Sequence, residues 1–482
     1  ANFPADVPLY AARQTVLDAV AGFPLHRGIL AHGIAAPPLD PATLIAEAPA
    51  DAVVVLLSAI ANHDNMGGIF RNAAAFGAYA ILIDAECCDP LYRKAIRVSV
   101  GTALTLPFAR LARGDDAVDM LTAAGFRVLS LSPAGAHDLH RVERGVDPRF
   151  ELGAVLALRD REKPQLFSAV AGHAMPVIGN LMNSRDRVAR LLGVEKPRLH
   201  QLILEALGKP IQPVLVEQAP LQEVVHGNDI DLGRILPVPT WFEHEGGPYI
   251  TAGVIVAKDP ETGRRNVSIA RLRLEGGDRV MVGIAKNHHL NLLAEKARKL
   301  GRKLPIAVAI GNHPAVLLGS QMYLGLGDDE YDVVGGLLGE PLELVRCRTV
   351  PLEVPAGAEI VLEGHIDNAD PIEEGDVSEF HGFYVRYGAG TGGTITCVTH
   401  RRDAIYQAIL PGYAAEHCLL GALAIEAVTC QALQRVIPSV RRVLVTDGGM
   451  GRLHAIISMH RPRLGEGKRA AILAMGQVNL FK

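Results

Sequence analysis

The N-terminal quarter of the chain alternates short apolar runs with a segment of helical composition. Residues 53–57 (VVVLL) and 79–83 (YAILI) are almost continuously apolar, as buried parallel strands are, and residues 126–131 form a third candidate strand. Residues 72–77, between the first two runs, have helical composition. Strand–helix–strand order with short glycine-containing connections predicts an open α/β sheet.

Further along the chain the pattern changes to alternation of apolar and polar positions. Residues 250–282 alternate around a DPETG turn, which predicts an antiparallel meander. Further strands are expected at 357–366 and 393–399, and helices at 147–159 and 185–192. The predicted fold is therefore α/β at both flanks with a β-rich centre, and the final AAILAMGQVNLFK is expected to end at the start of a strand.

Length and composition narrow the class of protein. A chain of 482 residues is too long for one ordinary core, so two or three domains are expected. With 49% hydrophobic and 21% charged residues it has a globular composition, and it contains no uninterrupted apolar run of about 18 residues, so we expect no membrane span. A net charge of −4 gives no global attraction to nucleic acid.

The six cysteines predict neither a disulfide scaffold nor a zinc site. They are scattered, and no pair has C-x-x-C spacing. The first residues, ANFPADVPLYAARQ, lack the basic flank and apolar core of a secretory signal. A reducing, cytoplasmic location is the expectation.

The first candidate site is an asparagine- and glycine-rich turn followed by an arginine on a helix. Such a turn could hold a phosphate or ribose, although a packing loop beside a solvated helix face is the alternative. The strings NHDNMGGIFRNAAAFG and DPLYRKAIRVS resemble the first conserved block of the SpoU/TrmH family of RNA 2′-O-ribose methyltransferases, over residues 53–131. These are knotted α/β proteins that use S-adenosylmethionine. The resemblance implies that Asn65 and Arg71 position the ribose.

Two later blocks of that family do not follow residue 131. They are a glycine-rich LGxEGxGL-like loop and a serine/asparagine-rich segment, which together build the methyl donor's pocket, and an unrelated pattern stands in their place. We therefore expect an incomplete, inactive methyltransferase segment, either a natural fusion or an artefact, and we do not expect RNA as a partner.

A second group of polar residues lies between positions 266 and 379. Asn266 and Arg271 are five residues apart, an odd separation that puts them on opposite faces of a regular strand, so a bulge or a strand end is needed if they share a site. The Asn266 amide, an imidazole from the run Asn287-His288-His289 and the Glu340 carboxylate would together suit Mn²⁺ or Mg²⁺. Ordinary satisfied polar pairs are the alternative.

Two glutamates, Glu374 and Glu379, lie in the segment EEGDVSEFHGFY. Paired carboxylates near an arginine differ in proton affinity, so one can donate a proton near neutral pH. An acidic surface loop is the alternative interpretation.

Longer strings make the resemblance of residues 139–482 specific. DPRFELGAVLALRDREKPQLF, GHAMPVIGNLMNSRDRVARLLGV, LPVPTWFEHEGGPYITAGVIVAKDPETGRRNVSIARL, LLGEPLELV and EGDVSEFHGFY occur in this order and resemble the UbiD family of reversible (de)carboxylases, which use prenylated FMN. The resemblance implies an N-terminal α/β domain, a central split β-barrel related to flavin reductases, and a C-terminal α/β domain that mediates dimers. We accordingly divide the chain into 1–137, 138–240, 241–400 and 401–482, the last incomplete because family chains continue past residue 478.

The resemblance also assigns roles to individual residues. Mn²⁺ or Mg²⁺, with K⁺ as a further candidate cation, would tie down the cofactor phosphate through Asn266, His289 and Glu340. The prenylated flavin would be bound by Asn266, Ser268, Ile269, Ala270, Arg271, His288, His289 and Glu340. The catalytic network would be Arg271, Glu374 and Glu379, with Glu379 as the proton donor tuned by the other two.

The implied reaction is non-oxidative decarboxylation of an aromatic, heteroaromatic or α,β-unsaturated acid. Losing CO₂ from such an acid directly would leave an unstabilised sp² carbanion, and the cofactor serves as the electron sink. A flavin prenyltransferase would supply the cofactor, and a homodimer or higher homo-oligomer is expected. An RNA methyltransferase and a non-catalytic chimera of the two families remain the alternatives.

Overall fold

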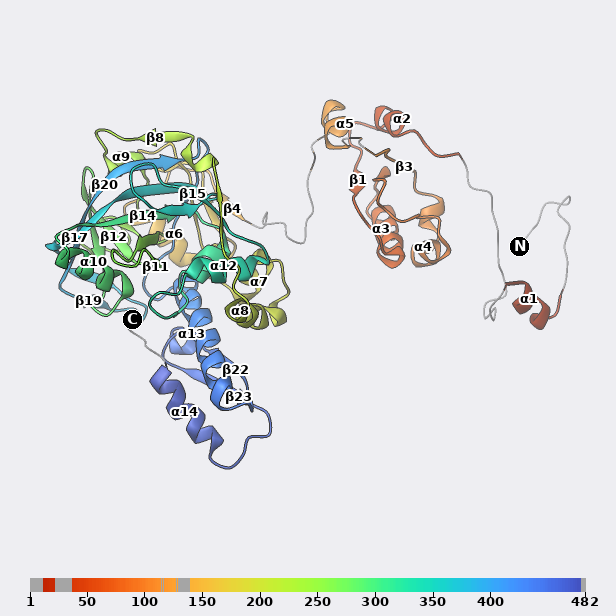
Figure 1. The fold of residues 1–482 in the computed structure, drawn as a ribbon. Coiled ribbons are helices and arrows are strands. Elements are labelled where there is room, and N and C mark those ends of the chain that lie inside the picture. The colour runs from red at the N-terminus through yellow and green to blue at the C-terminus, as the bar shows by residue number, and fades with distance from the viewer. Residues whose placement is uncertain are drawn as a thin grey trace. The chain divides into compact units, whose positions relative to one another are not determined.

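Parallel strands and helices alternate in the N-terminal part of the chain, and antiparallel strands dominate the rest (Figure 1). This computed structural model describes residues 12–21, 37–113, 115, 117–126, 128 and 139–477. Contacts divide the chain into two compact units, Ala1–Ser130 and Leu131–Lys482. The finer domain boundaries drawn from the sequence stay predictions.

The first unit contains a three-stranded parallel sheet of order β1-β2-β3. Its helices and strands are α1 (Gln14–Ala21), α2 (Pro41–Ala46), β1 (Val54–Leu57), α3 (His63–Ala75), β2 (Ala80–Ile83), α4 (Arg93–Val98), β3 (Phe108–Arg110) and α5 (Ala117–Ala123). The first two predicted strands are confirmed as β1 and β2. The sheet's third strand is β3, and most of the candidate strand at 126–131 lies outside the described residues.

The second unit is larger and builds several sheets. Its helices are α6 (Glu151–Leu158), α7 (Arg185–Leu191), α8 (Leu199–Gly208), α9 (Leu232–Ile235), α10 (His289–Lys299), α11 (Pro314–Gly319), α12 (Glu330–Leu338), α13 (Ala415–Val436) and α14 (Glu466–Gln477). The strands outside the main sheet are β4 (His140–Val142), β5 (Gln165–Phe167), β6 (Val177–Gly179), β7 (Val214–Val216), β15 (Glu343–Arg346), β16 (Glu353–Pro355), β18 (Asp376–Ser378), β19 (Tyr384–Arg386), β21 (Tyr406–Gln407), β22 (Val440–Val445) and β23 (Ala455–Met459).

The main sheet is antiparallel and has the order β11-β10-β14-β17-β20-β13-β12-β9, with β8 paired to β20. Its strands are β8 (Val224–His226), β9 (Tyr249–Ile250), β10 (Val254–Lys258), β11 (Arg265–Ile269), β12 (Arg271–Gly276), β13 (Arg279–Gly283), β14 (Leu304–Ile310), β17 (Ile360–Glu373) and β20 (Ala389–His400). The predicted hairpin of β10 and β11 and that of β12 and β13 are both present.

The connection from β11 to β12 shows that this sheet is strongly curved. The two strands are six steps apart in the pairing order, about 29 Å in a flat sheet. Only Ala270 separates them in sequence, so their ends lie within about 7 Å of each other. The sheet must therefore curl back on itself. Its pairing does not close among the described strands, so the split barrel stays a prediction.

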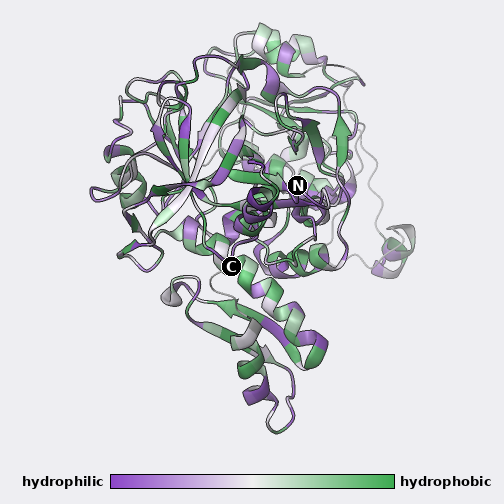
Figure 2. Cartoon of the chain, turned by 60° about the vertical axis from the view of Figure 1, so that its left-hand side comes forward, coloured by the Kyte–Doolittle hydropathy of each residue, from purple (hydrophilic) through white to green (hydrophobic). Residues whose placement is uncertain are grey.

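Both faces of the curled sheet are apolar. Along β10, Ile255 and Ala257 belong to one buried cluster, together with residues of α10, whereas Val254 and Val256 belong to a second cluster, together with residues of α8, α11, α12 and α13. Figure 2 shows many hydrophobic residues, in green, along the strands. Helices cover the second face, and this arrangement fixes α12 against the back of β11.

The last described element of the chain is helix α14. The AAILAMG segment, expected to approach a strand, lies in helix α14, where Ala470 and Ala474 face the core one turn apart while Met475 is exposed. The strand expected near residue 478 lies outside the described residues. Within the described part of the chain, α13 alone is long and apolar enough to cross a membrane, but 67% of its apolar window is buried inside the protein, as in a core helix.

Candidate functional site

The β10–β11 hairpin positions the first group of site residues. Its turn is closed by Asp259, whose carboxylate accepts hydrogen bonds from the backbone amides of Glu261 (2.9 Å) and Thr262 (3.3 Å), and Gly263 takes a left-handed conformation (φ +72°). The turn sets the register that pairs Ala257 with Asn266. The DPETG prediction is confirmed.

The strand end required between Asn266 and Arg271 is present. β11 ends at Ile269 and β12 begins at Arg271, so the regular two-residue alternation is interrupted at Ala270. Both side chains consequently line one cavity of about 470 Å³. Of the other predicted cofactor residues, Ser268, Ile269, His288 and His289 also line this cavity, and Ala270 lines an adjoining cavity of about 260 Å³.

Asn266 meets a carboxylate that the sequence analysis did not select. Glu330 is 3% exposed, and its two oxygens accept hydrogen bonds from Asn266 Nδ2 (3.3 Å) and the Val267 amide (2.8 Å). Glu330 and His289 line the same cavity as Asn266. The buried Oδ1 of Asn266 has no hydrogen-bond partner, and neither has the buried Oγ of Ser268.

A metal ion at this site would need Asn266 as one of its ligands. Among the described residues, no group of three His, Cys, Asp or Glu side chains is arranged to hold a metal ion. Asn266 supplies an amide oxygen instead, and amide, imidazole and carboxylate form a donor set suited to Mn²⁺ or Mg²⁺. The unpartnered Asn266 Oδ1 is the observation that fits such an ion, because buried polar atoms otherwise find partners.

The assignment of Glu340 to this site is corrected by the structure. Glu340 is exposed, follows the left-handed Gly339 that ends α12, and is not part of the cavity wall. Glu330 begins the same helix, so ten residues, about 15 Å of helical rise, separate the two carboxylates. The carboxylate that the structure places beside Asn266 and His289 is therefore Glu330.

Arg271 contacts both of the glutamates that the sequence analysis grouped with it, and all three residues line the same cavity. Arg271 Nε and Nη2 donate to Glu374 Oε1 (2.6 Å) and Oε2 (2.7 Å), a two-bond pairing in which Glu374 is 2% exposed. Glu379 is held more loosely, with its Oε1 3.7 Å from Arg271 Nη1. Arg271 thus has one tightly bound and one loosely bound carboxylate.

Tyr387 and Glu245 extend this network. Tyr387 lies under Arg271, with the guanidinium carbon 5.1 Å from the centre of the Tyr387 ring. Burial raises the pKa of Tyr387 to about 12, so it stays a hydrogen-bond donor. Glu379 is close enough to contribute to the raised pKa of Tyr387. Glu245 accepts a hydrogen bond from the Ser378 amide (3.2 Å), next to Glu379, and burial raises the pKa of Glu245 to about 7.

The adjoining cavity brings a histidine near these acids. His417 lines it together with Glu245, Arg271 and Glu379. Burial, reinforced by the positive charge of Arg452, lowers the pKa of His417 to about 4, so its ring is neutral at physiological pH. The sequence analysis selected none of four residues that come from segments far apart in the chain: Glu245, Tyr387 and Arg452 in loops, and His417 in the first turn of α13. One feature of the sequence could have pointed to Glu330. It is the last residue of the acidic run DDE, and the helical segment of α12 begins there.

In the first unit, the residues proposed to position a ribose lie on one helix. Asn65 and Arg71 are both exposed on α3. Neighbouring α4 carries the basic residues Arg93, Lys94 and Arg97, and Lys94 forms a 2.6 Å ion pair with Asp64 of α3. Nothing in this geometry distinguishes a ribose grip from a solvated helical face.

Comparison with family models identifies both parts of the chain. The UbiD model, described as the 3-octaprenyl-4-hydroxybenzoate carboxy-lyase Rift-related domain, matches residues 213–414, and the corresponding C-terminal domain matches residues 418–482. The SpoU rRNA methylase family model matches residues 52–209. That span crosses the boundary between the two structural units.

Relatives and solved structures agree with the UbiD match. Anhydromevalonate phosphate decarboxylase of Methanothermobacter thermautotrophicus is 35% identical over 342 residues, covering 69% of this chain and 77% of that protein. An evolved dimeric form of the UbiD-class enzyme HmfF from Pelotomaculum thermopropionicum, solved with prFMN, is similar with a TM-score of 0.70 at 41% identity, covering 72% of this chain and 82% of that one. Vanillic acid decarboxylase of Sedimentibacter hydroxybenzoicus is similar with a TM-score of 0.67 at 28% identity, covering 72% and 76%. The chain belongs to the UbiD family of carboxy-lyases.

Proposed function

We propose that this chain decarboxylates an aromatic, heteroaromatic or α,β-unsaturated acid with the help of prenylated FMN and a divalent cation. One observation carries the proposal: a single cavity is lined both by Asn266, His289 and Glu330 and by Arg271 with its two glutamates. The first set suits a phosphate-bridging cation, and the second suits proton transfer beside a carboxylate. The fold supports it, because UbiD-class HmfF has been solved with prFMN and with FMN.

The residues present fit the cofactor and its metal. Asn266 Oδ1 and Ser268 Oγ are buried polar atoms without a partner, as expected of atoms whose partner is a bound group. Asn266, His289 and Glu330 would hold Mn²⁺ or Mg²⁺, and Ser268, Ile269, Ala270 and His288 would contact the flavin. When bound, prenylated FMN supplies the electron sink that decarboxylation of an sp² carbon requires.

The chain's own residues bind the substrate carboxylate, shield it from water and supply a proton. Glu374 binds Nε and Nη2 of Arg271, which leaves Nη1 available as a hydrogen-bond donor in the cavity. This remaining nitrogen, near Glu379, is the one that can face a substrate carboxylate. Glu379 would donate the proton that replaces CO₂, since its contact with Arg271 is long and its surroundings are largely buried. Tyr387 and Glu245 would orient the Glu379 turn.

The finer features rest on similarity. Structural neighbours are named for 3,4-dihydroxybenzoic acid and vanillic acid, and a sequence relative for anhydromevalonate phosphate, so both aromatic and phosphorylated acids belong in a substrate screen. We propose a homo-oligomer in the cytoplasm, a split barrel for the curled sheet, and a flavin prenyltransferase as cofactor supplier. A dimeric neighbour supports the first of these.

The test is co-expression with a flavin prenyltransferase, followed by absorbance, mass and manganese analysis of the purified chain. Prenylated FMN and Mn²⁺ near one per chain, with CO₂ release from acids of the screen, is the expected result. A chain that binds neither would support the non-catalytic chimera. Methyl transfer from S-adenosylmethionine to RNA by the same preparation would favour the methyltransferase alternative.

A further inference from the structure

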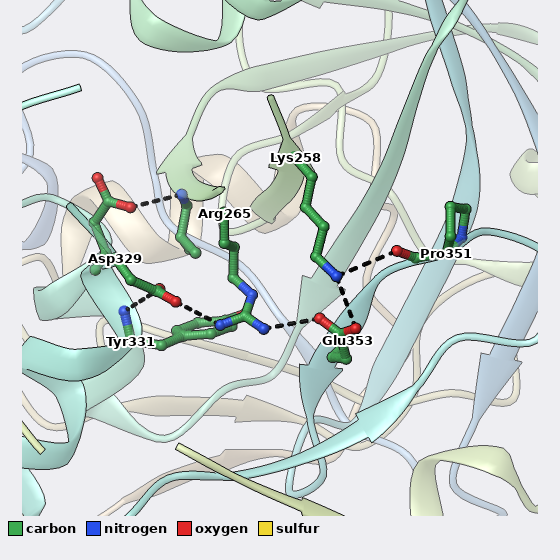
Figure 3. Close-up of polar contacts among 8 residues, drawn as sticks. Lys258, Arg265, Asp329, Tyr331, Pro351 and Glu353 are labelled. Carbon is green, nitrogen blue, oxygen red and sulfur yellow. Dashed lines mark hydrogen bonds and ion pairs between the residues drawn. The ribbon is translucent and has the colours of Figure 1, made fainter. Parts of the chain in front are cut away.

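A second arginine in this region, Arg265, is bound by two carboxylates and an aromatic ring. Its Nη1 lies 2.6 Å from Asp329 Oδ2, and its Nη2 lies 2.8 Å from Glu353 Oε2 (Figure 3). Its guanidinium stands 5.3 Å from the centre of the buried Tyr331 ring. The side chain is 12% exposed, so these contacts are protected from water.

The contacts of Arg265 belong to a row of alternating charges that crosses four elements. Lys258 of β10 pairs with Glu353 of β16 at 2.8 Å, Glu353 pairs with Arg265 of β11, and Arg265 pairs with Asp329 at the start of α12. Figure 3 shows the four side chains in this order. Asp329 also caps α12 by accepting a hydrogen bond from the Tyr331 amide (3.0 Å). The row therefore ties the first turn of α12 to β11.

Each half of the Arg265–Asp329 pair is the immediate neighbour of a proposed metal ligand. Arg265 precedes Asn266 in β11, and Asp329 precedes Glu330 at the start of α12. Neighbours in a strand point to opposite faces, so Arg265 and Asn266 leave β11 on opposite sides. On one side Arg265 binds Asp329, and on the other Asn266 binds Glu330, which also accepts a hydrogen bond from the backbone amide of Val267. The first turn of α12 is thus tied to β11 on both sides of the strand.

We propose that Arg265 is a positioning residue for the metal site, which it acts on through Asp329. The Arg265–Asp329 pair fixes the separation of Asn266 and Glu330, which the proposed function assigns as metal ligands, and this inference rests on that assignment. The pair touches neither cofactor nor substrate. Partners that orient metal ligands typically change metal affinity about 10- to 100-fold when removed.

The main test compares Arg265→Met with Arg185→Met in the full chain. Arg185 forms a largely buried two-bond pair with Glu426 of α13, at 2.9 and 2.5 Å, and does not line the cavity. Mn²⁺ binding is measured by electron paramagnetic resonance with saturating FMN, and the melting temperature is measured alongside. We expect Arg265→Met to raise the Mn²⁺ Kd about 10- to 100-fold and Arg185→Met to leave it unchanged despite a comparable loss of melting temperature.

A second comparison tests whether Asp329 is the partner through which Arg265 acts. Asp329→Asn keeps a good helix cap but loses the ion pair. It should weaken Mn²⁺ binding as Arg265→Met does, and the double variant should bind no more weakly than the weaker single variant. Three results would overturn this inference but leave the metal site standing. They are additive losses of Mn²⁺ affinity in the double variant, an unchanged Kd in Arg265→Met, and equal weakening of Mn²⁺ binding in Arg185→Met. A wild-type chain that binds no Mn²⁺ would overturn the metal site itself.

Discussion

Two arginines six residues apart, Arg265 and Arg271, are each bound by two carboxylates, yet the two arrangements differ in their freedom. Arg265 holds Asp329 and Glu353 at 2.6 and 2.8 Å, so both partners are engaged at short range. Arg271 holds Glu374 equally tightly, but Glu379 stands 3.7 Å away and lines both cavities. Glu379 is thus a carboxylate without a tight ion pair, as a group that transfers a proton should be.

The acids around the two arginines also differ in proton affinity. At Arg265, burial alone would raise the pKa of Glu353, but hydrogen bonds from Lys258 and Arg265 hold it below its ordinary value. Near Arg271, burial raises the pKa of Glu245 to about 7, and the nearby arginine offsets this only in part. Glu353, beside Arg265, therefore stays ionised, whereas Glu245, near Arg271, can change charge near neutral pH. We therefore assign the Arg265 cluster to positioning the metal ligands and the Arg271 cluster to proton transfer.

The largest expected effect is on the loosely held carboxylate. Glu379→Gln should lower the rate of CO₂ release about 10²- to 10⁴-fold, because an amide cannot donate the proton of a general acid. Flavin and Mn²⁺ content should not change. Glu373→Gln, at the exposed end of β17 six residues before Glu379, is the matched control. Full activity in Glu379→Gln would refute its role and remove the contrast between the two arginines.

The next effect separates two glutamates at opposite ends of α12. Glu330→Gln should weaken Mn²⁺ binding by at least about 10-fold, since it removes a ligand charge. Glu340→Gln should leave the Kd unchanged, because that side chain is exposed outside the cavity. Titration of each variant with Mn²⁺ in the presence of FMN decides between them. Weakening by Glu340→Gln alone would restore the sequence-based assignment.

Opposite dependences of stability on pH should distinguish Glu245 from Glu353. The folded protein binds the Glu245 proton more tightly than the unfolded chain does, so its stabilising contribution is complete below about pH 4.5 and is lost as the pH rises through about 7. The change is at most about 3 kcal/mol. Glu353 contributes above about pH 4.5, and its contribution is lost as the pH falls through its lowered pKa.

Thermal unfolding between pH 4 and pH 8 measures both contributions. Glu245→Gln should flatten the decline of the melting temperature toward neutral pH. Glu353→Gln should flatten the decline on the acid side. If both variants changed the same side of the profile, the distinction between the two clusters would be lost.

Site residues could be predicted from the sequence where their positions are fixed by neighbouring residues in the chain. The DPETG turn follows from neighbouring residues and was predicted. Before Arg271 a bulge or a strand end was required only if Arg271 and Asn266 share a site, and the structure has the strand end. Glu330 and Glu340 each adjoin the same helix, and only the packing of α12 behind β11 decides which of them reaches Asn266. No local pattern contains that information.

The fold shows the same division between local and distant causes. Alternating strands and the β10–β11 hairpin were predicted, because side-chain period and turn residues are visible in the sequence. The three-residue β3 is too short to show a period, and α14 was missed because its helical face contains small alanines rather than large apolar residues. The curl of the main sheet depends on the pairing of strands distant in sequence, which one sequence does not show.

The smallest expected effect is at the outer end of the charge row. Lys258 is 29% exposed and pairs with Glu353, which Arg265 also holds. Lys258→Met should therefore cost no more than about 1 kcal/mol of unfolding free energy and should leave Mn²⁺ affinity unchanged, because the Arg265–Asp329 pair remains. Denaturant unfolding and Mn²⁺ titration of the same preparation measure the two quantities. A loss of Mn²⁺ affinity as large as that of Arg265→Met would mean that the whole row, rather than its inner pair, positions the metal ligands.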